Sequence, residues 1–158
     1  MQGITILLVG NTDSEHVRAL VDEYLKRANR FLPVEVKVLP EVRLSKKDSR
    51  EKQKQLEGAA ILGAIGPQDE AILLDERGRE YSSREFADFL QRKMQTIPRR
   101  MLLIVGGPYG FSEEVYRQVP LRLSLSKMTL SHQLVRLFAV EQVYRALTII
   151  NHHPYHHD

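Results

Sequence analysis

The chain contains no cysteine in its 158 residues. It therefore has neither a disulfide framework nor a thiolate zinc site, and this composition is compatible with the cytosol. No run of about 18 apolar residues occurs, so we expect no membrane span. The first ten residues, MQGITILLVG, lack the basic region and the small-residue cleavage site of a signal peptide. Together these absences predict a cytoplasmic protein.

Neither sign of charge dominates: the chain has 23 Lys and Arg residues and 20 Asp and Glu residues, which gives a net charge of +3. Such a mildly basic balance permits a nucleic-acid partner without requiring one. Basic residues do cluster in one segment, at Arg43, Lys46, Lys47, Arg50, Lys52 and Lys54. A segment of this kind is usually a solvated helix face, and it contacts phosphates only if other observations indicate nucleic acid.

Short apolar runs alternate with amphipathic segments along the whole chain. The expected strands are 4–9, 34–39, 71–74 and 101–105, and the expected helices are 14–30, 45–62, 82–94, a short helix capped by Ser112, and 132–151. Alternation of this type predicts an α/β fold with a mostly parallel sheet. No linker interrupts it, so we expect a single domain over residues 1–158.

Local capping and turn signals refine these boundaries. Thr12 and Ser82 are each followed three residues later by glutamate, which is the spacing of a capping box. We therefore expect both residues to be helix N-caps. The sequence DERG after the third strand predicts a turn at residues 75–78.

A glycine-rich stretch, IVGGPYGFSEE, joins an apolar strand to a capped helix at residues 104–114. Ligands of parallel sheets bind at this place, outside the carboxyl ends of the strands. The stretch indicates either an adenosyl or ribose contact or simply a tight turn that needs positive φ. A dinucleotide fold or P-loop does not fit, because the spacing differs and Pro108 supplies no N–H to a phosphate.

The final helix carries more apolar positions than one buried stripe needs. Its polar residues form a narrow band of Glu141, Gln142, Arg145 and Thr148. The helix is therefore expected to pack on its own sheet and on a second copy of the chain, or to be covered entirely by its own neighbours. The terminal NHHPYHHD is rich in histidine, but Pro154 interrupts any helical pairing, so we expect no metal site.

Three C-terminal stretches, LLIVGGPYGFS, LSLSKMTLSHQLVRLFAVEQVYRA and HPYH, together with LLDERG, resemble the ribosomal RNA large subunit methyltransferase H family. The resemblance implies a SPOUT-type α/β fold with a deep trefoil knot, formed by about residues 101–150. It also implies a homodimer that uses S-adenosylmethionine to methylate N3 of a pseudouridine in helix 69 of 23S ribosomal RNA. The substrate would be the assembled ribosome, since so small a protein has little surface for reading sequence.

The resemblance further implies that main-chain groups of LSLSKMTLSH bind the cofactor. The implied cofactor residues are Leu74, Gly106, Leu125, Ser126, Lys127, Met128, Thr129 and Leu130. The chain departs from the family in two places. Tyr109 stands where family members often have an acidic residue, and His132 lies between Ser131 and Gln133 where they often have prolines.

Methyl transfer to N3 requires removal of an imide proton, so a general base is expected. His132 follows the cofactor loop and is the first candidate, because histidine titrates in the right range. Arg145 and Tyr155, with His156, are expected to hold the base or a phosphate, in one subunit or across the dimer interface. Their simpler interpretations are a first-turn helix residue for His132 and an ion pair with Glu141 for Arg145.

A second function class stays open at this point. In it the chain is a non-catalytic SPOUT-fold dimer that binds RNA or an adenosyl ligand without transferring a methyl group. Tyr109 and the altered surroundings of His132 are the features that favour it.

Overall fold

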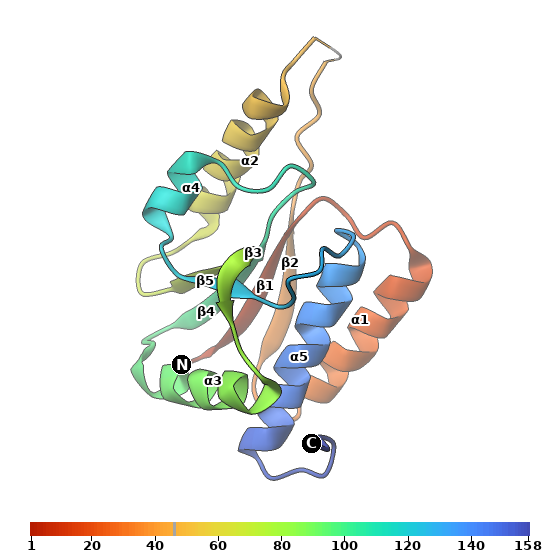
Figure 1. Cartoon of the computed structure of the whole chain (residues 1–158), viewed down its shortest axis with the longest axis vertical. Coiled ribbons are helices and arrows are strands. Elements are labelled where there is room, and N and C mark those ends of the chain that lie inside the picture. The colour runs from red at the N-terminus through yellow and green to blue at the C-terminus, as the bar shows by residue number, and fades with distance from the viewer. Residues whose placement is uncertain (46) are drawn as a thin grey trace.

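The computed structural model describes residues 1–45 and 47–158, so Lys46 of the basic cluster lies outside the described residues. Helices and strands alternate in the order β1 (Gly3–Val9), α1 (Glu15–Ala28), β2 (Val34–Leu39), α2 (Arg50–Ala64), β3 (Glu70–Glu80), α3 (Ser83–Thr96), β4 (Arg100–Val105), α4 (Glu113–Gln118), β5 (Arg122–Ser124) and α5 (Leu134–Ile150). The strands form one parallel sheet in the order β2-β1-β4-β3-β5. The predicted α/β fold with a parallel sheet is confirmed (Figure 1).

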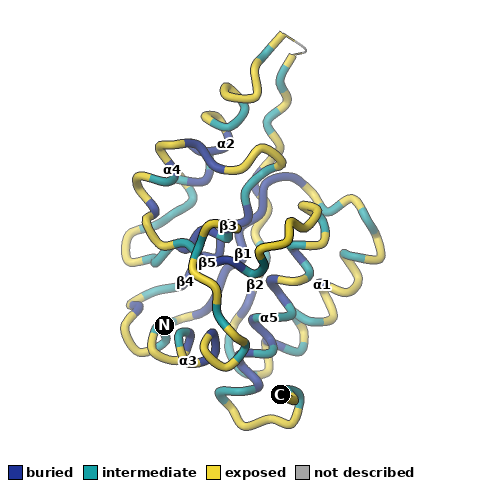
Figure 2. Tube along the Cα trace, viewed as in Figure 1, coloured by how far each residue is buried: buried dark blue, intermediate teal, exposed yellow. Residues whose placement is uncertain are grey.

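Helices cover both faces of the sheet. Helices α1, α3 and α5 pack together on one face, and α2 and α4 pack together on the other. Within β1, Ile4 and Ile6 point to the first layer and Leu7 to the second, and each is at most 1% exposed. Burial on both faces explains why the strands are continuous apolar runs and not alternating ones. The strands and the inner side of α5 form the dark core in Figure 2.

Strand β3 does not turn at DERG, so that prediction is wrong. The strand continues to residue 80 with a register shift, and Leu74 and Arg79 both pair with Leu123 of β5. The residues between them, 75–78, form what we call the β3 bulge. In Figure 1 the ribbon after the β3 bulge crosses in front of the segment that leads from β5 to α5. A SPOUT-type knot would thread the chain at this crossing, and the knot itself stays a prediction.

Side-chain caps place the helix starts. Ser14, and not Thr12 as predicted, is the N-cap of α1, and α2 begins after the cap Ser49, later than the predicted residue 45. The capping box of Ser82 and Glu85 is confirmed at α3. Thr12 was a wrong choice because two hydroxyl residues lie within reach of the same helix end, and the sequence pattern does not separate them.

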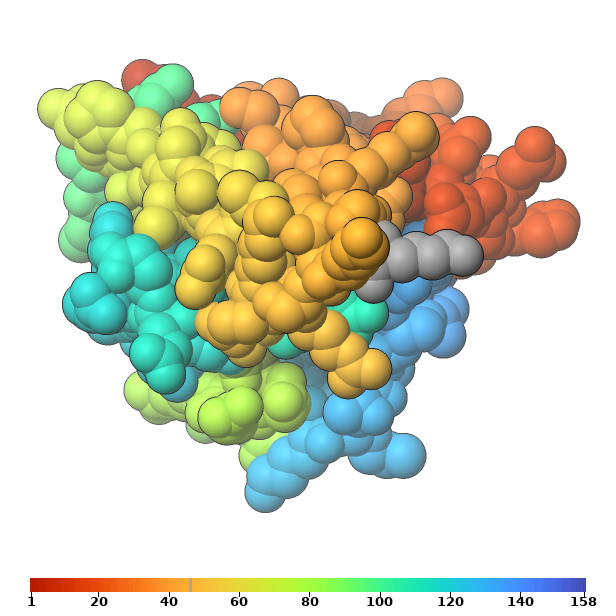
Figure 3. Space-filling model, turned by 90° about the horizontal axis from the view of Figure 1, so that it is seen from above, coloured from red at the N-terminus to blue at the C-terminus, as the bar shows by residue number. Residues whose placement is uncertain are grey.

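The segment before α2 and the start of that helix project from the sheet, nearest the viewer in Figure 3. Helix α5 begins at Leu134, two residues later than predicted, and the Ser131 hydroxyl accepts a hydrogen bond from the Leu134 N–H at 3.2 Å. Thr148 is fully buried, so it does not belong to the predicted polar band. Strand β5 was not predicted, because its three residues are too few to show a period.

Candidate active site

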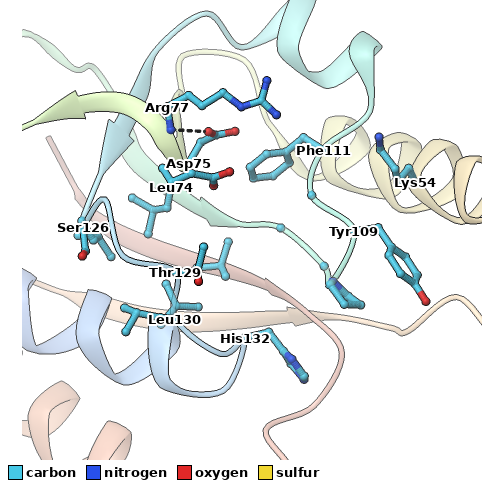
Figure 4. Close-up of a pocket in the computed structure, with 18 of the residues that line it drawn as sticks. Lys54, Leu74, Asp75, Arg77, Tyr109, Phe111, Ser126, Thr129, Leu130 and His132 are labelled. Carbon is cyan, nitrogen blue, oxygen red and sulfur yellow. Dashed lines mark hydrogen bonds between the residues drawn. The ribbon is translucent and has the colours of Figure 1, made fainter.

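A cavity of about 570 Å³ lies at the carboxyl end of β4 and beside the β3 bulge (Figure 4). Its walls are residues 74–77 of β3, the glycine loop (residues 106–110), and the segment 125–132, which we call the threaded loop. The position is the one where open parallel sheets bind ligands. Its volume lies within the range of small-molecule and cofactor sites, which is about 300–1,000 Å³.

The structure brings together most of the residues predicted to bind the cofactor. Those that line the cavity are Leu74, Gly106, Leu125, Ser126, Met128, Thr129 and Leu130. Lys127 is not among them, and its Nζ lies 3.4 Å from a carboxylate oxygen of Glu80. The predicted site is therefore one continuous surface made from two distant parts of the chain.

The threaded loop leaves its main chain available. Within the described part of the chain, residues 126–130 make no backbone-to-backbone hydrogen bond. The Met128 N–H donates to the Ser126 hydroxyl at 3.0 Å, and the Ser126 carbonyl accepts from the Ser124 hydroxyl at 3.1 Å. The remaining N–H and C=O groups can hydrogen-bond an adenine or an amino-acid group.

The glycine loop is a tight turn, as one of the two interpretations predicted. The Gly110 N–H donates to the Gly107 carbonyl at 3.1 Å, and Gly110 has φ of +78°. A Cβ on Gly107 would overlap the carboxylate of Glu57, a residue that is only 2% exposed. Gly110 is therefore required by its backbone conformation, and Gly107 is required because a side chain would not fit beside Glu57.

Asp75 places a fixed carboxylate on the cavity wall. The Tyr116 hydroxyl donates to its Oδ2, and the Arg77 N–H donates to its Oδ1 at 2.8 Å. Burial and the hydrogen bond to Asp75 raise the pKa of Tyr116 to about 12. Sequence reasoning did not select Asp75, although an acidic residue directly after an apolar strand end was a signal that could have found it.

His132 lines the cavity and is exposed, next to the first turn of α5. Its carbonyl accepts a hydrogen bond of 3.0 Å from Nε of Arg136, which is only 2% exposed. The Arg136 guanidinium also donates to the carbonyls of Val9 and Gly10 at 2.8 and 2.9 Å, and to the Thr12 hydroxyl at 3.1 Å. Burial lowers the pKa of Arg136. The residue thus ties the backbone of His132 to the end of β1.

Arg136 was missed by sequence reasoning. The available signal was a charge outside the polar band of the last helix, between the apolar residues Val135 and Leu137. Because charged groups are rarely buried without partners, such a charge predicts either a polar network or an interface.

Arg145 and Tyr155 lie together, but not beside His132. Arg145 donates to Glu141 at 2.6 Å, which confirms the predicted ion pair, and lies 3.2 Å from Nδ1 of His156. The Tyr155 hydroxyl donates to the same Glu141 at 3.0 Å, and burial raises the pKa of Tyr155. None of these residues lines the cavity. The eleven residues from the start of α5 to Arg145 correspond to about 16 Å along the helix axis.

Residues 1–45 and 47–158 contain neither a metal-binding cluster nor a membrane-spanning helix. None of their groups of histidine, aspartate and glutamate could hold a metal ion. None of their helices combines the length and the apolar character needed to cross a membrane.

Comparison with known proteins identifies the family. A family model described as "Predicted SPOUT methyltransferase" matches residues 1–156. The chain is 55% identical over 155 residues to ribosomal RNA large subunit methyltransferase H of Porphyromonas gingivalis, covering 98% of this chain and 99% of the relative. It is 47% and 42% identical over 154 residues to the proteins of that name from Bacteroides thetaiotaomicron and Christiangramia forsetii, covering 98% of both chains in each pair.

The chain belongs to the ribosomal RNA large subunit methyltransferase H family. Membership in the SPOUT methyltransferases implies that it uses a methyl donor.

Proposed function

We propose that the chain is an S-adenosylmethionine-dependent methyltransferase of ribosomal RNA, acting on N3 of a pseudouridine in helix 69 of 23S ribosomal RNA within the assembled ribosome. The observation that carries this proposal is the cavity at the end of β4 and the β3 bulge, bounded by a threaded loop with free main-chain groups. The names of the relatives and the sequence resemblance support the choice of RNA substrate.

Different residues of the cavity wall bind different parts of the donor. Leu74, Leu125 and Leu130 provide apolar surface for an adenine ring, and the backbone of residues 126–130 provides its hydrogen bonds. Gly106 allows a ligand to approach the main chain closely, as glycine does at ligand-binding turns. S-adenosylmethionine, when bound, supplies an electrophilic methyl group on a sulfonium.

His132 is the group best placed to take the proton from N3. It lines the cavity, and Figure 4 shows its ring at the edge of the site, pointing away from Leu74 and Phe111. A general base of this kind contributes about 10²–10⁴-fold to the rate. Arg136 holds the backbone of His132 and so has a positioning role and not a catalytic one.

We also propose a homodimer in which each site takes residues from both subunits. Apolar side chains remain exposed at the threaded loop and the start of α5: Met128 at 79%, Leu130 at 38%, Leu134 at 50% and Phe138 at 36%. Burying this surface against a second copy would stabilise the dimer. The arrangement supports a role for Arg145 and Tyr155 of the partner, since within one subunit they lie far from His132. Residues 1–158 then act as one domain, with the knot in about residues 101–150.

Donor binding and methyl transfer test the function directly. We expect titration calorimetry to show one S-adenosylmethionine bound per cavity, and methylation of intact ribosomes to exceed that of naked 23S RNA. His132→Ala should lower kcat by about 10²-fold or more while donor affinity stays within about twofold. Donor binding without transfer to any RNA would favour the non-catalytic dimer, and equal activity on naked RNA would contradict the ribosomal substrate.

Mixed dimers test the composite site. A dimer of one His132→Ala subunit and one Arg145→Met subunit keeps one intact site only if the two residues meet across the interface. We then expect about half of the wild-type activity, because one of two equivalent sites survives. Near-complete loss in the mixed dimer would show that both residues serve the same subunit.

A further inference from the structure

Tyr109 is an exposed aromatic residue at the mouth of the cavity. It lies in the glycine loop, lines the cavity and is 41% exposed. Its hydroxyl forms no hydrogen bond with any residue of 1–45 and 47–158, and its ring belongs to neither hydrophobic core. Packing within the subunit therefore gives no reason for a tyrosine here.

Arg50 lies over the ring of Tyr109. It is the first residue of α2, and the carbon of its guanidinium is 5.1 Å from the ring centroid. Arg50 is exposed, and its guanidinium has no carboxylate within ion-pair distance among the described residues. A cation held over an aromatic ring keeps its charge available to a phosphate while it restricts the orientation of the ring.

Further positive charge surrounds this pair. Lys54 and Arg77 line the same cavity, and Figure 4 shows Lys54 beside Tyr109. Lys54 has only a long contact of 3.7 Å with Glu51. The acidic residues on the cavity wall are Glu76, which is exposed, and Asp75, whose oxygens are already hydrogen-bonded by Tyr116 and by the Arg77 N–H.

Arg43 and Lys47, in the segment before α2, are exposed as well. Lys52 in the same region is neutralised by Asp48, at 2.6 Å, and is therefore a weaker candidate for a phosphate contact.

We infer that Tyr109 and Arg50 form a docking site for an RNA nucleotide next to the one that is methylated. A base of the single strand stacks on the Tyr109 ring, and Arg50 and Lys54 neutralise the flanking phosphates. Exposed aromatic rings beside arginine are the usual means of holding unpaired bases. An acidic peptide would use the cations but would leave the exposed ring without a partner. This inference depends on the proposed RNA substrate and names the surface that receives it.

Substitutions at both residues, measured for RNA affinity and for donor affinity, test the inference. Removing the ring in Tyr109→Ala should weaken binding of a single-stranded oligoribonucleotide, and raise KM for ribosomes, by about 10-fold to 100-fold. The conservative variant Tyr109→Phe keeps the ring and should recover most of this loss. Donor affinity should change less than about twofold, because the threaded loop supplies the hydrogen bonds to the donor.

Arg50→Met should lower the slope of log affinity against log salt by about 0.7, the value for one phosphate contact on a single strand. Arg79→Met is the matched control, since the Arg79 guanidinium carbon lies 4.8 Å from the Tyr81 ring centroid and does not line the cavity. If both arginine substitutions lower the salt slope equally, the loss of net charge alone explains the effect and the inference is overturned. Unchanged oligonucleotide binding in Tyr109→Ala, or a parallel loss of donor affinity, would overturn it as well.

The two proposals can fail separately. If the wild-type protein binds the oligonucleotide through Tyr109 but transfers no methyl group, the proposed catalytic function fails and the docking site stands. If the wild-type protein methylates ribosomes and Tyr109→Ala does so with the same KM, the docking site alone is refuted.

Discussion

Replacing Arg136 by methionine removes the buried guanidinium that joins α5 to β1. Two of its bonds, to the carbonyls of Val9 and Gly10, lie in buried surroundings, and a third holds the carbonyl of His132. Each buried carbonyl left without a donor costs about 1–3 kcal/mol. Removing a desolvated charge offsets part of this cost, so we expect a net loss of about 3 kcal/mol in the free energy of unfolding.

Denaturant and thermal unfolding measure this loss. For a chain of this size a loss of about 3 kcal/mol corresponds to a fall of about 6–12 °C in Tm. Arg136→Lys keeps the charge but has fewer donors in a less suitable geometry, so its stability should be intermediate. Arg92→Met, at an exposed position of α3, is the matched control and should change stability by less than about 0.5 kcal/mol.

The same variant should also weaken donor binding, because the turn that carries His132 loses its attachment to β1. Titration calorimetry on the folded fraction measures this effect. A change in the free energy of unfolding below about 1 kcal/mol for Arg136→Met would refute the reasoning, since it would mean that the carbonyls find other donors without cost.

Three further predictions follow from individual contacts. Gly78→Ala would place a Cβ 2.6 Å from the backbone nitrogen of Leu123, so denaturant unfolding should show a loss of about 3 kcal/mol or more in the free energy of unfolding. The control Gly63→Ala, in helix α2 with open space around it, should instead stabilise the protein by about 0.5–1 kcal/mol. Equal effects of the two substitutions would contradict the crossing of β3 over β5. In the wild-type protein, the raised pKa of Tyr116 favours the folded state until the folded hydroxyl ionises, so stability should fall between pH 10 and about 12. Tyr116→Phe should remove this fall. Identical profiles of stability against pH for both proteins would argue against the bond to Asp75. Ser82→Ala should cost about 1 kcal/mol in chemical denaturation by removing the capping box of α3, and a negligible change would count against that cap.

Much of the fold could be predicted from local patterns. The apolar runs of β1, β2 and β4 and the amphipathic segments of α1 and α3 appear within a residue or two of their predicted places. The errors occur where tertiary contacts override a local signal. DERG is a good turn sequence, yet it remains in β3 because β5 pairs with the strand on both sides of the β3 bulge.

Only some residues of the candidate site were predicted from the sequence. Family resemblance supplied the residues of the threaded loop, His132 was chosen for its place after that loop and its titration range, and most of these residues line one cavity. Asp75 and Arg136 were missed, because their importance comes from partners that lie far away in the sequence: Tyr116 for Asp75, and Val9 and Gly10 for Arg136. A side-chain type alone does not reveal such a partner.

The sequence by itself determined the alternation of strands and helices, since the period of apolar residues depends only on neighbours along the chain. It also determined the family, through motifs that are long enough to exclude chance. Only the tertiary structure decided that a polar loop would stand beside Leu74 and Gly106, and that a buried arginine would hold it there. The physical reason is that main-chain groups and buried charges form hydrogen bonds with whichever groups the fold brings near them. Local periodicity does not indicate which residues more than a hundred positions apart become neighbours.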